Sequence, residues 1–300
     1  MVTEFACAKI NLGIDVPFRR DDGYHEVDMI MQSLSLRDTI IIEKRSSGSE
    51  VKLDIVSDEG SIDVSALPTD GSNLCIRAAK LLLEDKGIDT GMDILLIKRI
   101  PFEAGLGGGS SDAAAVLRAV NYLYELGYSL DDLMRLGAGI GADVPFCVKG
   151  GTARLKGIGE RYEPMAAGAS GVPLVLVKPD FGISTAAIYN TLDSVADPVH
   201  PYIDALESAV RSGSIKSIAG AMGNILEDAA LPGYPMIASI KSEINSYKAA
   251  GAMMTGSGST VFGLFEDEKD ARTAAMNLKK KHPTWFIKTT TTQNKAGASP

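Results

Sequence analysis

A run of glycines followed by hydroxyl side chains is the segment of this sequence best suited to chemistry. Residues 105–111 read GLGGGSS, between an apolar strand pattern that ends at Pro101 and an apolar helical pattern that continues to Leu123. Glycine lets the backbone approach a bulky anion, and the free amides and positive end of a helix attract negative charge. The segment predicts a phosphate-binding loop, and the structural alternative is a flexible connection between a strand and a helix.

The glycine segment differs from two common nucleotide-binding patterns. Ser110 stands where a P-loop would place its lysine, and three consecutive glycines break the spacing of a dinucleotide fingerprint. We therefore expect main-chain amides to supply the phosphate contacts.

A carboxylate and an amine each stand alone among small or apolar neighbours. Asp143 lies in GADVPF, and Lys9 interrupts the apolar stretch from Phe5 to Ile14. A carboxylate beside a cation stays ionised and can take a proton from an attacking hydroxyl. An ammonium in an apolar stretch needs an anionic partner or a solvated cleft. Two structural alternatives stay open: Asp143 could cap a turn, and Lys9 could reach water from an edge strand.

Polar and aromatic side chains near the amino terminus predict a ligand-binding surface. Strand alternation puts Asn11 on the same face as Lys9. Tyr24 and His25 follow a predicted turn at residues 22–23 and offer an aromatic face and ring nitrogens suited to a flat heterocycle. Such hairpin aromatics also commonly pack against a neighbouring strand, so this alternative stays open.

The elements that must position these residues alternate between strand and helix. Hydrophobic periodicity predicts strands at 3–16, 39–44, 51–56 and 94–100. It also predicts a helix from residue 72 or 73 to 86, a helix from about 113 that Gly127 closes, and a helix after Ser129. Because Val144 precedes a proline, the chain is expected to become extended there. Later in the chain we expect a strand at 174–177, a helix that starts at residues 184–185 and contains Ile188, and helices at 203–211 and 235–250. Two strands flanking GSGST at 256–260, a Lys-rich helix and a strand near Trp285 follow. The GSGST segment could line a ligand or form a simple hairpin turn.

Composition limits the class of protein. With 300 residues, 45% hydrophobic and 23% charged, the chain is typical of a folded protein of one or two domains. Its 30 basic and 38 acidic residues give a net charge of −8, which argues against a nucleic-acid partner. Three cysteines without a CxxC pair indicate a reducing compartment, and the amino terminus resembles neither a signal peptide nor a membrane span. We expect a cytoplasmic location and no membrane partner; the sequence does not indicate the oligomeric state.

Five motifs, in order along the chain, resemble the GHMP kinase superfamily. They are AKINL at 8–12, DGYHE at 22–26, PFEAGLGGGSSDAAA at 101–115, GADVPF at 141–146 and TGSGST at 255–260. The resemblance implies an α/β (α+β) fold with an N-terminal ribosomal-protein-S5-like domain, a C-terminal ferredoxin-like domain and substrates in the cleft between them. With the change of composition after about residue 160, we expect an ATP-binding domain over 1–162, a second domain over 163–292 and a flexible tail over 293–300.

The same resemblance implies an ATP-dependent kinase that uses Mg²⁺ and phosphorylates an alcohol. DGYHE, GADVPF and AKINL together point to the members that act on the 2-hydroxyl of a cytidyl-diphosphate methylerythritol, in the non-mevalonate route to isoprenoid precursors. Two alternatives stay open: another kinase of this superfamily, for homoserine, a mevalonate derivative or a sugar, and a non-catalytic S5-like protein that binds RNA.

Site residues are carried over by motif. The resemblance makes Asp143 the general base, which also contacts the substrate, and Lys9 the lysine beside the acceptor hydroxyl, with Asn11 on the substrate. It places ATP against Pro101 and the loop residues Gly105, Leu106, Gly107, Gly108, Gly109, Ser110 and Ser111. It places cytosine against Tyr24, His25 and Tyr189. The metal ligands stay unknown. Glu103 departs from the small or apolar residue that related loops often carry. Two outcomes stay open: its carboxylate faces away from the phosphates, or it faces them and weakens ATP binding by repulsion.

Overall fold

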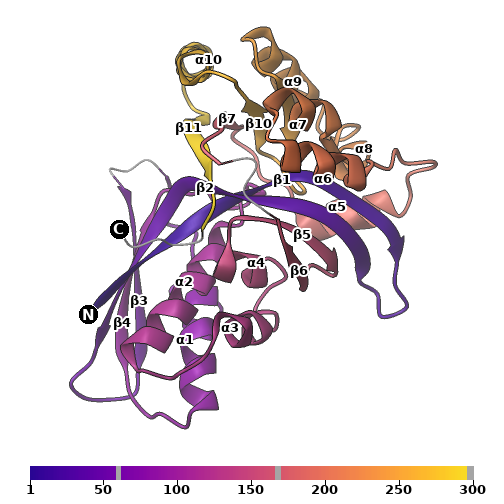
Figure 1. Ribbon diagram of the computed structural model, residues 1–300. Coiled ribbons are helices and arrows are strands. Elements are labelled where there is room, and N and C mark those ends of the chain that lie inside the picture. The colour runs from indigo at the N-terminus through magenta and orange to yellow at the C-terminus, as the bar shows by residue number, and fades with distance from the viewer. Residues whose placement is uncertain (59–61, 166–169, 296–300) are drawn as a thin grey trace.

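The structure is a computed structural model that describes residues 1–58, 62–165 and 170–295 (Figure 1). Its strands are β1 (Val2–Arg19), β2 (His25–Lys44), β3 (Val51–Ser57), β4 (Met92–Lys98), β5 (Thr152–Gly157), β6 (Arg161–Pro164), β7 (Pro173–Lys178), β8 (Gly223–Asn224), β9 (Gly251–Met254), β10 (Val261–Leu264) and β11 (Phe286–Gln293). Its helices are α1 (Leu74–Asp85), α2 (Gly108–Leu123), α3 (Leu130–Gly137), α4 (Val144–Lys149), α5 (Thr185–Leu192), α6 (Ile203–Ser212), α7 (Ile215–Ala221), α8 (Leu226–Ala230), α9 (Met236–Ser246) and α10 (Glu268–Lys281). The expected mixed α/β class is confirmed.

A long antiparallel hairpin of β1 and β2 runs through the middle of the molecule. The predicted turn at residues 22–23 joins the two strands, and the register pairs Lys9 with Ser33 and Asn11 with Met31. In Figure 1 the helices α1 to α4 lie on one side of this hairpin, and α6 to α9 lie on the other. Both faces of the hairpin are therefore covered, which explains why its central residues are buried.

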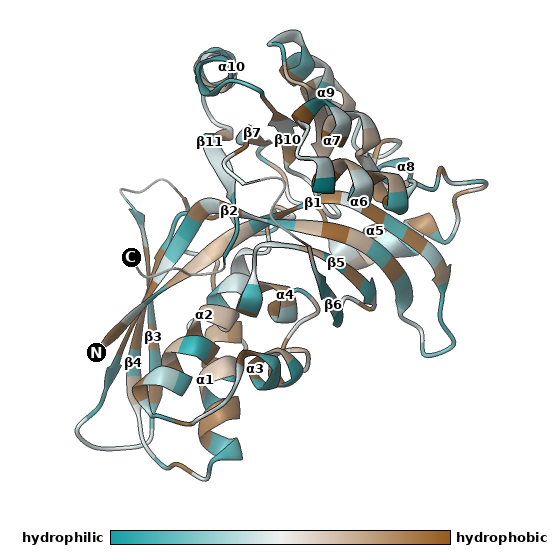
Figure 2. Cartoon of the chain, in the orientation of Figure 1, coloured by the Kyte–Doolittle hydropathy of each residue, from teal (hydrophilic) through white to brown (hydrophobic). Residues whose placement is uncertain are grey.

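Two apolar cores lie against the hairpin. Side chains of α1, α2 and α4 pack on one face of the sheet, and those of α6 and α7 pack with Ile10 and Leu12 on the other. Small residues let α2 approach the sheet closely, and Ala113, Ala114 and Ala115 are completely buried. Figure 2 shows brown residues along the strands and on the inner helices, whereas α10 is largely teal. Hydrophobic burial thus fixes the position of α2, the helix that follows the glycine segment, against the sheet.

The last described strand joins the two halves of the chain. β11 pairs antiparallel with β7 from Phe286 to Thr291, and it pairs with β2 at Thr292 and Gln293. The path through the sheet is β3-β4-β2-β11-β7-β10-β9, so residues from both ends of the chain share one sheet. The predicted boundary between residues 162 and 163 falls inside β6, which pairs with β5, and it stays a prediction.

Some expectations about local structure are wrong. Val144 begins α4 instead of an extended segment, because a proline is tolerated in the first helical turn, where backbone amides lack helical acceptors. Gln293 belongs to β11 instead of the predicted tail, and its side chain donates a hydrogen bond to the sulfur of Cys7. Residues 166–169, shortly after the predicted domain boundary, and residues 296–300 of the predicted tail lie outside the described residues.

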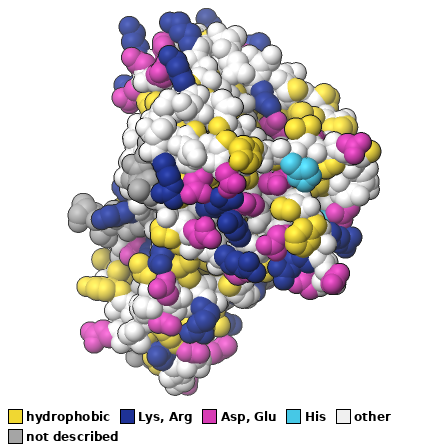
Figure 3. Space-filling view, turned by 45° about the vertical axis from the view of Figure 1, so that its right-hand side comes forward, with side chains coloured by type: hydrophobic (Ala, Val, Ile, Leu, Met, Phe, Trp, Pro, Cys, Tyr) yellow, Lys and Arg dark blue, Asp and Glu magenta, His cyan; other side chains and the backbone are white. Residues whose placement is uncertain are grey.

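Charged side chains of both signs mix on the molecular surface. On the face in Figure 3, Lys and Arg side chains alternate with Asp and Glu across the middle, and no broad basic patch forms there. Among the described residues, no helix combines the length and the apolar run that crossing a bilayer requires. The face in Figure 3 therefore lacks the electrostatic footprint of a nucleic-acid surface.

Candidate active site

Lys9 and Asp143 meet although they come from β1 and from the start of α4. Lys9 Nζ lies 3.4 Å from Asp143 Oδ2, and the two side chains are 5% and 29% exposed. Lys9 is therefore a buried ammonium with a carboxylate partner, and its side chain does not reach water, which excludes the alternative of a solvated edge-strand lysine. The Asp143 carboxylate is solvent-accessible on its other side, so a ligand can reach it.

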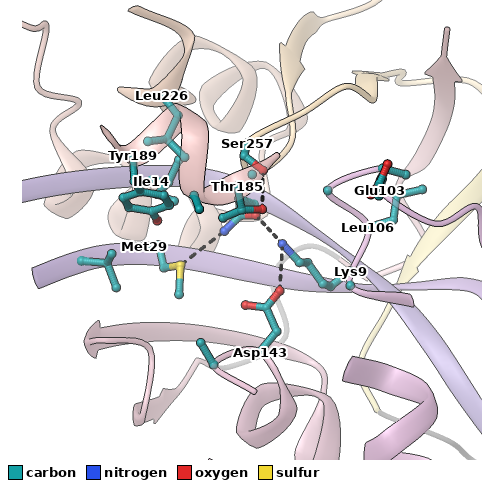
Figure 4. A pocket seen from close by; sticks show the side chains of 18 of the residues that line it. Lys9, Ile14, Met29, Glu103, Leu106, Asp143, Thr185, Tyr189, Leu226 and Ser257 are labelled. Atoms are coloured by element: carbon teal, nitrogen blue, oxygen red, sulfur yellow. Dashed lines mark hydrogen bonds and ion pairs between the residues drawn. The ribbon is translucent and has the colours of Figure 1, made fainter. Parts of the chain in front are cut away.

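The Asp143 side chain does not cap the helix that begins beside it. Asp143 is the N-cap residue of α4, but its side chain makes no cap hydrogen bond. It pairs instead with Lys9, and the carboxylate faces the cleft (Figure 4). The alternative that Asp143 serves only to cap a turn is therefore wrong.

Asn11 connects the Lys9 side chain to two other segments. Its Oδ1 accepts a 2.8 Å hydrogen bond from Lys9 Nζ, and its Nδ2 lies 3.3 Å from the sulfur of Met29 on β2. The backbone amide of Asn11 donates to Thr255 Oγ1 at 3.0 Å. Lys9 thus has a fixed direction, because the amide that accepts from it is itself held.

The glycine loop lies directly over Lys9. The backbone amide of Lys9 donates to Leu106 O at 3.0 Å, and Gly107 has a φ of +68°. A Cβ on Gly107 would come within 2.8 Å of Lys9 Cγ, and a Cβ on Gly105 would come within 2.2 Å of Thr255 O. Real Cβ atoms do not approach other atoms this closely, so the close contacts require glycine. The loop is therefore packed against its surroundings, unlike a flexible connection.

These residues line one cleft of about 820 Å³. The predicted site residues among its walls are Lys9, Asn11, Tyr24, His25, Pro101, Gly105, Leu106, Gly107, Gly108, Gly109, Asp143 and Tyr189. Ser110 and Ser111 are not among them, and the Ser111 hydroxyl is buried and donates to Gly108 O at 2.8 Å. The structure thus brings the predicted catalytic, substrate-binding and loop residues into one cleft, whereas Ser110 and Ser111 do not line it.

Aromatic rings gather at one end of the cleft. The rings of His25 and Tyr189 lie 5.0 Å apart at 46°, and His25 Nε2 lies 2.7 Å from Asp193 Oδ1. Burial, followed by the charge of Asp143, raises the pKa of the Tyr189 phenol, so this ring is uncharged at neutral pH. Tyr24 is 61% exposed at the rim. Because Tyr24 leaves so much of its ring in solvent, the alternative that it only packs against a strand does not describe it.

Glu103 lies at the opposite end of the cleft from Tyr189. In Figure 4 the Lys9–Asp143 pair lies between them. The Glu103 side chain packs against Gly182, where a Cβ would come within 2.6 Å of Glu103 Oε2. The carboxylate is thus directed toward the segment that follows β7, and this geometry favours the first of the two outcomes left open for this residue.

The segment TGSGST is buried and joins the site from the second half of the chain. Thr255 Oγ1 donates to Gly105 O at 3.3 Å, and Ser257 Oγ lies 2.9 Å from Thr185 Oγ1. Asn224 Nδ2 donates to Met254 O and Gly256 O at 2.9 Å each. The two predicted strands flank this segment, as β9 and β10. Sequence reasoning missed Asn224 because a single polar residue carries no spacing signal, and it included Thr255 in the TGSGST motif without assigning it a contact.

The sequence indicates no metal ligands, and the described part of the chain contains no group of side chains built to bind a metal ion. Among the described residues, no three His, Cys, Asp or Glu side chains are grouped so as to hold an ion. Two carboxylates line the cleft: Asp143 is paired with Lys9, and Glu103 packs against Gly182. Mg²⁺ commonly binds phosphate oxygens and water with few protein ligands. The side chains of this cleft fit only that way of binding the ion.

Comparison with known proteins decides the family. Family models for the GHMP kinases N terminal domain and the GHMP kinases C terminal match residues 73–151 and 205–284. A 4-diphosphocytidyl-2-C-methyl-D-erythritol kinase of Alkaliphilus oremlandii is 44% identical over 271 residues, 90% of each chain. One of Acetivibrio thermocellus is 43% identical over 282 residues, 94% of this chain and 96% of the relative. The chain belongs to this family of GHMP kinases.

Solved structures agree with membership of the 4-diphosphocytidyl-2-C-methyl-D-erythritol kinase family. A crystal structure of a 4-(cytidine 5'-diphospho)-2C-methyl-D-erythritol kinase is 35% identical, with a TM-score of 0.77 over 97% of this chain and 99% of its own. A homoserine kinase from Cytophaga hutchinsonii has a TM-score of 0.78 but 18% identity, over 99% of this chain and 96% of its own, so it shows the fold alone. The two-domain GHMP kinase fold is therefore confirmed.

Proposed function

We propose that this chain transfers the γ-phosphoryl group of ATP to the 2-hydroxyl of 4-diphosphocytidyl-2-C-methyl-D-erythritol. The observation that carries the proposal is the 3.4 Å contact between Lys9 Nζ and Asp143 Oδ2, in a cleft with a glycine loop and an aromatic end. Family membership supports the same substrate, since the relatives carry that name. The established part is the kinase family, and the residue roles below are our assignments.

Proton transfer is the task of Asp143. Its carboxylate takes the proton of the substrate hydroxyl while the hydroxyl oxygen attacks the γ-phosphorus. The bond from that phosphorus to the bridging oxygen of ADP breaks, and ADP leaves with the electron pair. The ammonium of Lys9 stabilises the carboxylate and the acceptor oxygen as it loses its proton.

Positioning of the triphosphate is the task of the glycine loop. The start of α2 has Gly107 at its N-cap and Gly108 as its first residue, so free amides and the positive helix end face the cleft without side chains in the way. Ser110 and Ser111 belong to this turn through their backbone amides, since the Ser111 hydroxyl is occupied within the helix. A magnesium ion bound to the triphosphate would neutralise part of its charge during transfer.

Recognition of the cytosine is the task of the aromatic end. Tyr24 and Tyr189 offer ring faces, and His25 offers its other ring nitrogen, Nδ1, for a hydrogen bond, because Nε2 already contacts Asp193. A homoserine or mevalonate acceptor has no base to place there, which favours the cytidyl substrate over these alternatives. The interspersed charges of the surface also disfavour an RNA-binding role.

A reducing, cytoplasmic location remains our expectation. Cys7, Cys75 and Cys147 are free and buried, which fits a compartment where disulfides are not formed.

Consumption of ATP with and without the cytidyl-diphosphate alcohol tests the proposal. We expect ATP turnover to depend on that alcohol, and homoserine, mevalonate or a sugar to leave the rate at background. Turnover with one of those alcohols instead would overturn the acceptor while keeping the kinase. Tight RNA binding at low salt without any turnover would overturn both.

A further inference from the structure

Beneath the glycine loop lies a buried cluster of ionisable side chains that take no direct part in the proposed phosphoryl transfer. Lys98 at the end of β4, Asp38 of β2 and Asp112 of α2 have side chains that are 3%, 0% and 4% exposed. Lys98 Nζ donates to Asp38 Oδ2 at 2.5 Å and to Asp112 Oδ2 at 2.7 Å. One ammonium thus faces two carboxyl groups, away from water.

The cluster holds both ends of the glycine loop. Asp38 Oδ1 accepts from the backbone amides of Arg99 and Ile100, at 2.5 and 2.9 Å, just before the loop begins. Asp112 lies in the first turns of α2, just after the loop. Lys98 joins the two carboxyl groups, so the entry strand and the exit helix are tied at one point.

The cluster also touches the loop itself. A Cβ on Gly108 would lie 3.4 Å from Lys98 Nζ and 3.2 Å from Ile100 Cγ2. Gly108 is the first residue of α2, where the helix amides face the cleft. Any charge on the cluster therefore acts immediately behind the predicted phosphate site.

The two carboxyl groups have very different partners. Asp38 accepts hydrogen bonds at both oxygens, from two amides and from Lys98. Asp112 accepts at Oδ2 from Lys98, whereas its Oδ1 is buried and has no hydrogen-bond partner among the described residues. A buried carboxylate oxygen without a donor is costly, but a protonated carboxyl group needs fewer donors. The single negative charge that Lys98 can balance therefore belongs on Asp38.

We propose that Asp38, Lys98 and Asp112 are the positioning residues of the glycine loop and act as a unit without net charge, in which Asp112 is a neutral carboxylic acid. If both carboxyl groups were ionised, the cluster would carry a net negative charge behind the site of a triphosphate. Repulsion between these charges in a dry interior would oppose ATP binding. A neutral cluster fixes the loop without this penalty.

The surrounding titratable groups are consistent with the assignment. Burial, opposed by Lys98 and reinforced by Asp38, holds the pKa of the Asp112 carboxyl well above its usual range. Burial lowers the pKa of Lys98, but Asp112 and Asp38 together raise it above its usual value. Cys75 of α1 is buried close to the same cluster, and burial raises the pKa of its thiol. Cys75 is therefore neutral too and supplies no charge to Asp112.

Carbon-13 NMR of protein labelled at the aspartate carboxyl carbons tests the protonation state directly, and it needs neither substrate nor activity. The resonance that is missing from Asp112→Asn belongs to Asp112. We expect it at the chemical shift of a neutral acid and unchanged between about pH 6 and pH 8. A resonance at the carboxylate position would overturn the assignment. Asp54→Asn, an exposed residue of β3, is the matched control and should remove a carboxylate resonance.

Substitution of Asp112 and of Asp38 should change the melting temperature by different amounts. Asparagine mimics the shape of a neutral aspartic acid, so Asp112→Asn should melt within about 2 °C of the unchanged protein. Asp38→Asn removes the charge that Lys98 needs and should lower the melting temperature by about 10 °C or prevent folding. Equal losses for the two variants would contradict the proposal.

Kinetics test the positioning role, which rests on the proposed function. Lys98→Met leaves the Asp38 charge unbalanced under the loop, and we expect the KM for ATP to rise about tenfold or more while the KM for the alcohol changes less than about twofold. Equal rises for both substrates, or none, would remove the positioning role. If Lys98→Met does not fold, the NMR spectrum and Asp112→Asn still decide the charge assignment.

Discussion

The backbone amide of Asn11 donates a 3.0 Å hydrogen bond to the hydroxyl of Thr255, a residue 244 positions later in the chain. The same hydroxyl donates to Gly105 O at 3.3 Å. One side chain from the second half of the protein therefore connects the strand that carries Lys9 with the loop assigned to ATP.

Thr255→Val should separate these two segments. The buried amide of Asn11 would lose its acceptor, and we expect the free energy of unfolding to fall by about 1–3 kcal/mol. We also expect kcat/KM for ATP to fall about tenfold, since the loop loses its contact with the strand. Thr255→Ser keeps the hydroxyl and should behave like the unchanged protein. Denaturant unfolding and steady-state kinetics measure both effects, and a Val variant equal to the Ser variant would contradict the role.

Asp143→Asn should abolish most of the turnover while ATP still binds. The amide is nearly isosteric but cannot accept the hydroxyl proton, and we expect kcat to fall by at least about 100-fold. Binding of a non-hydrolysable ATP analogue, measured by calorimetry, should change by less than about threefold, because Asp143 contacts Lys9 instead of the loop. Asp131→Asn on the exposed side of α3 is the control. Near-normal turnover of Asp143→Asn would remove the general-base assignment.

Gly107→Ala should disturb Lys9 through direct contact. Gly107 and Gly127 both have positive φ, +68° and +76°, so alanine at either position should cost about 1–2 kcal/mol of stability. A Cβ at Gly107 would collide with Lys9 Cγ, whereas a Cβ at Gly127 would meet nothing within 4 Å. We therefore expect kcat to fall at least about tenfold for Gly107→Ala and to stay unchanged for Gly127→Ala. Similar kcat values for the two variants would show that Lys9 is not displaced.

Tyr24→Ala should weaken binding of the cytidyl substrate without affecting the fold. The side chain is 61% exposed, so its removal costs little stability, but stacking of a base on an aromatic ring is worth about 1–3 kcal/mol. We expect the KM of the alcohol substrate to rise about tenfold and the KM of ATP to stay within about twofold. Tyr122→Ala, another exposed tyrosine, on α2, serves as the control. An equal rise in both KM values would exclude a stacking role.

Glu207→Gln should reduce stability in a pH-dependent way. Hydrogen bonds from Arg211 and then Arg154 lower the pKa of the Glu207 carboxyl, and Arg154 belongs to β5 while Glu207 belongs to α6. Because the folded pKa lies below the unfolded one, this stabilisation is present above the unfolded pKa of about 4.3 and is lost as the pH falls through the folded pKa. Melting curves should differ between the two proteins at pH 7 and converge in acid. A difference independent of pH would mean that packing, not charge, holds this contact.

Much of the local structure could be predicted because it depends on nearby residues. Asn73 and Ser129 cap α1 and α3 with their side chains, and Ser184 caps α5, as the sequence pattern indicates. The strand alternation that puts Lys9 and Asn11 on one face was also sufficient to predict a shared site.

Other features depend on contacts that no local pattern encodes. The position of Pro145 in the first turn of α4, against the expectation of an extended segment, follows from the fit of this short helix into the core between α2 and α3. Asn224 donates hydrogen bonds to Met254 O at the end of β9 and to Gly256 O just after it, and β11 pairs with β2. Both contacts join residues far apart in sequence. Periodicity has no means of matching such partners, so these parts of the site became visible only in three dimensions.

The place of β11 in the sheet sets the order in which the enzyme can be completed during translation. β11 follows every other described element along the chain, yet it lies between β7 and β2. A nascent polypeptide that has emerged only as far as α10 leaves the edge of β7 without its neighbour, and such open edges invite pairing with other chains. The two halves are joined when this strand docks, so the cleft between them cannot be complete before β11 has been synthesised.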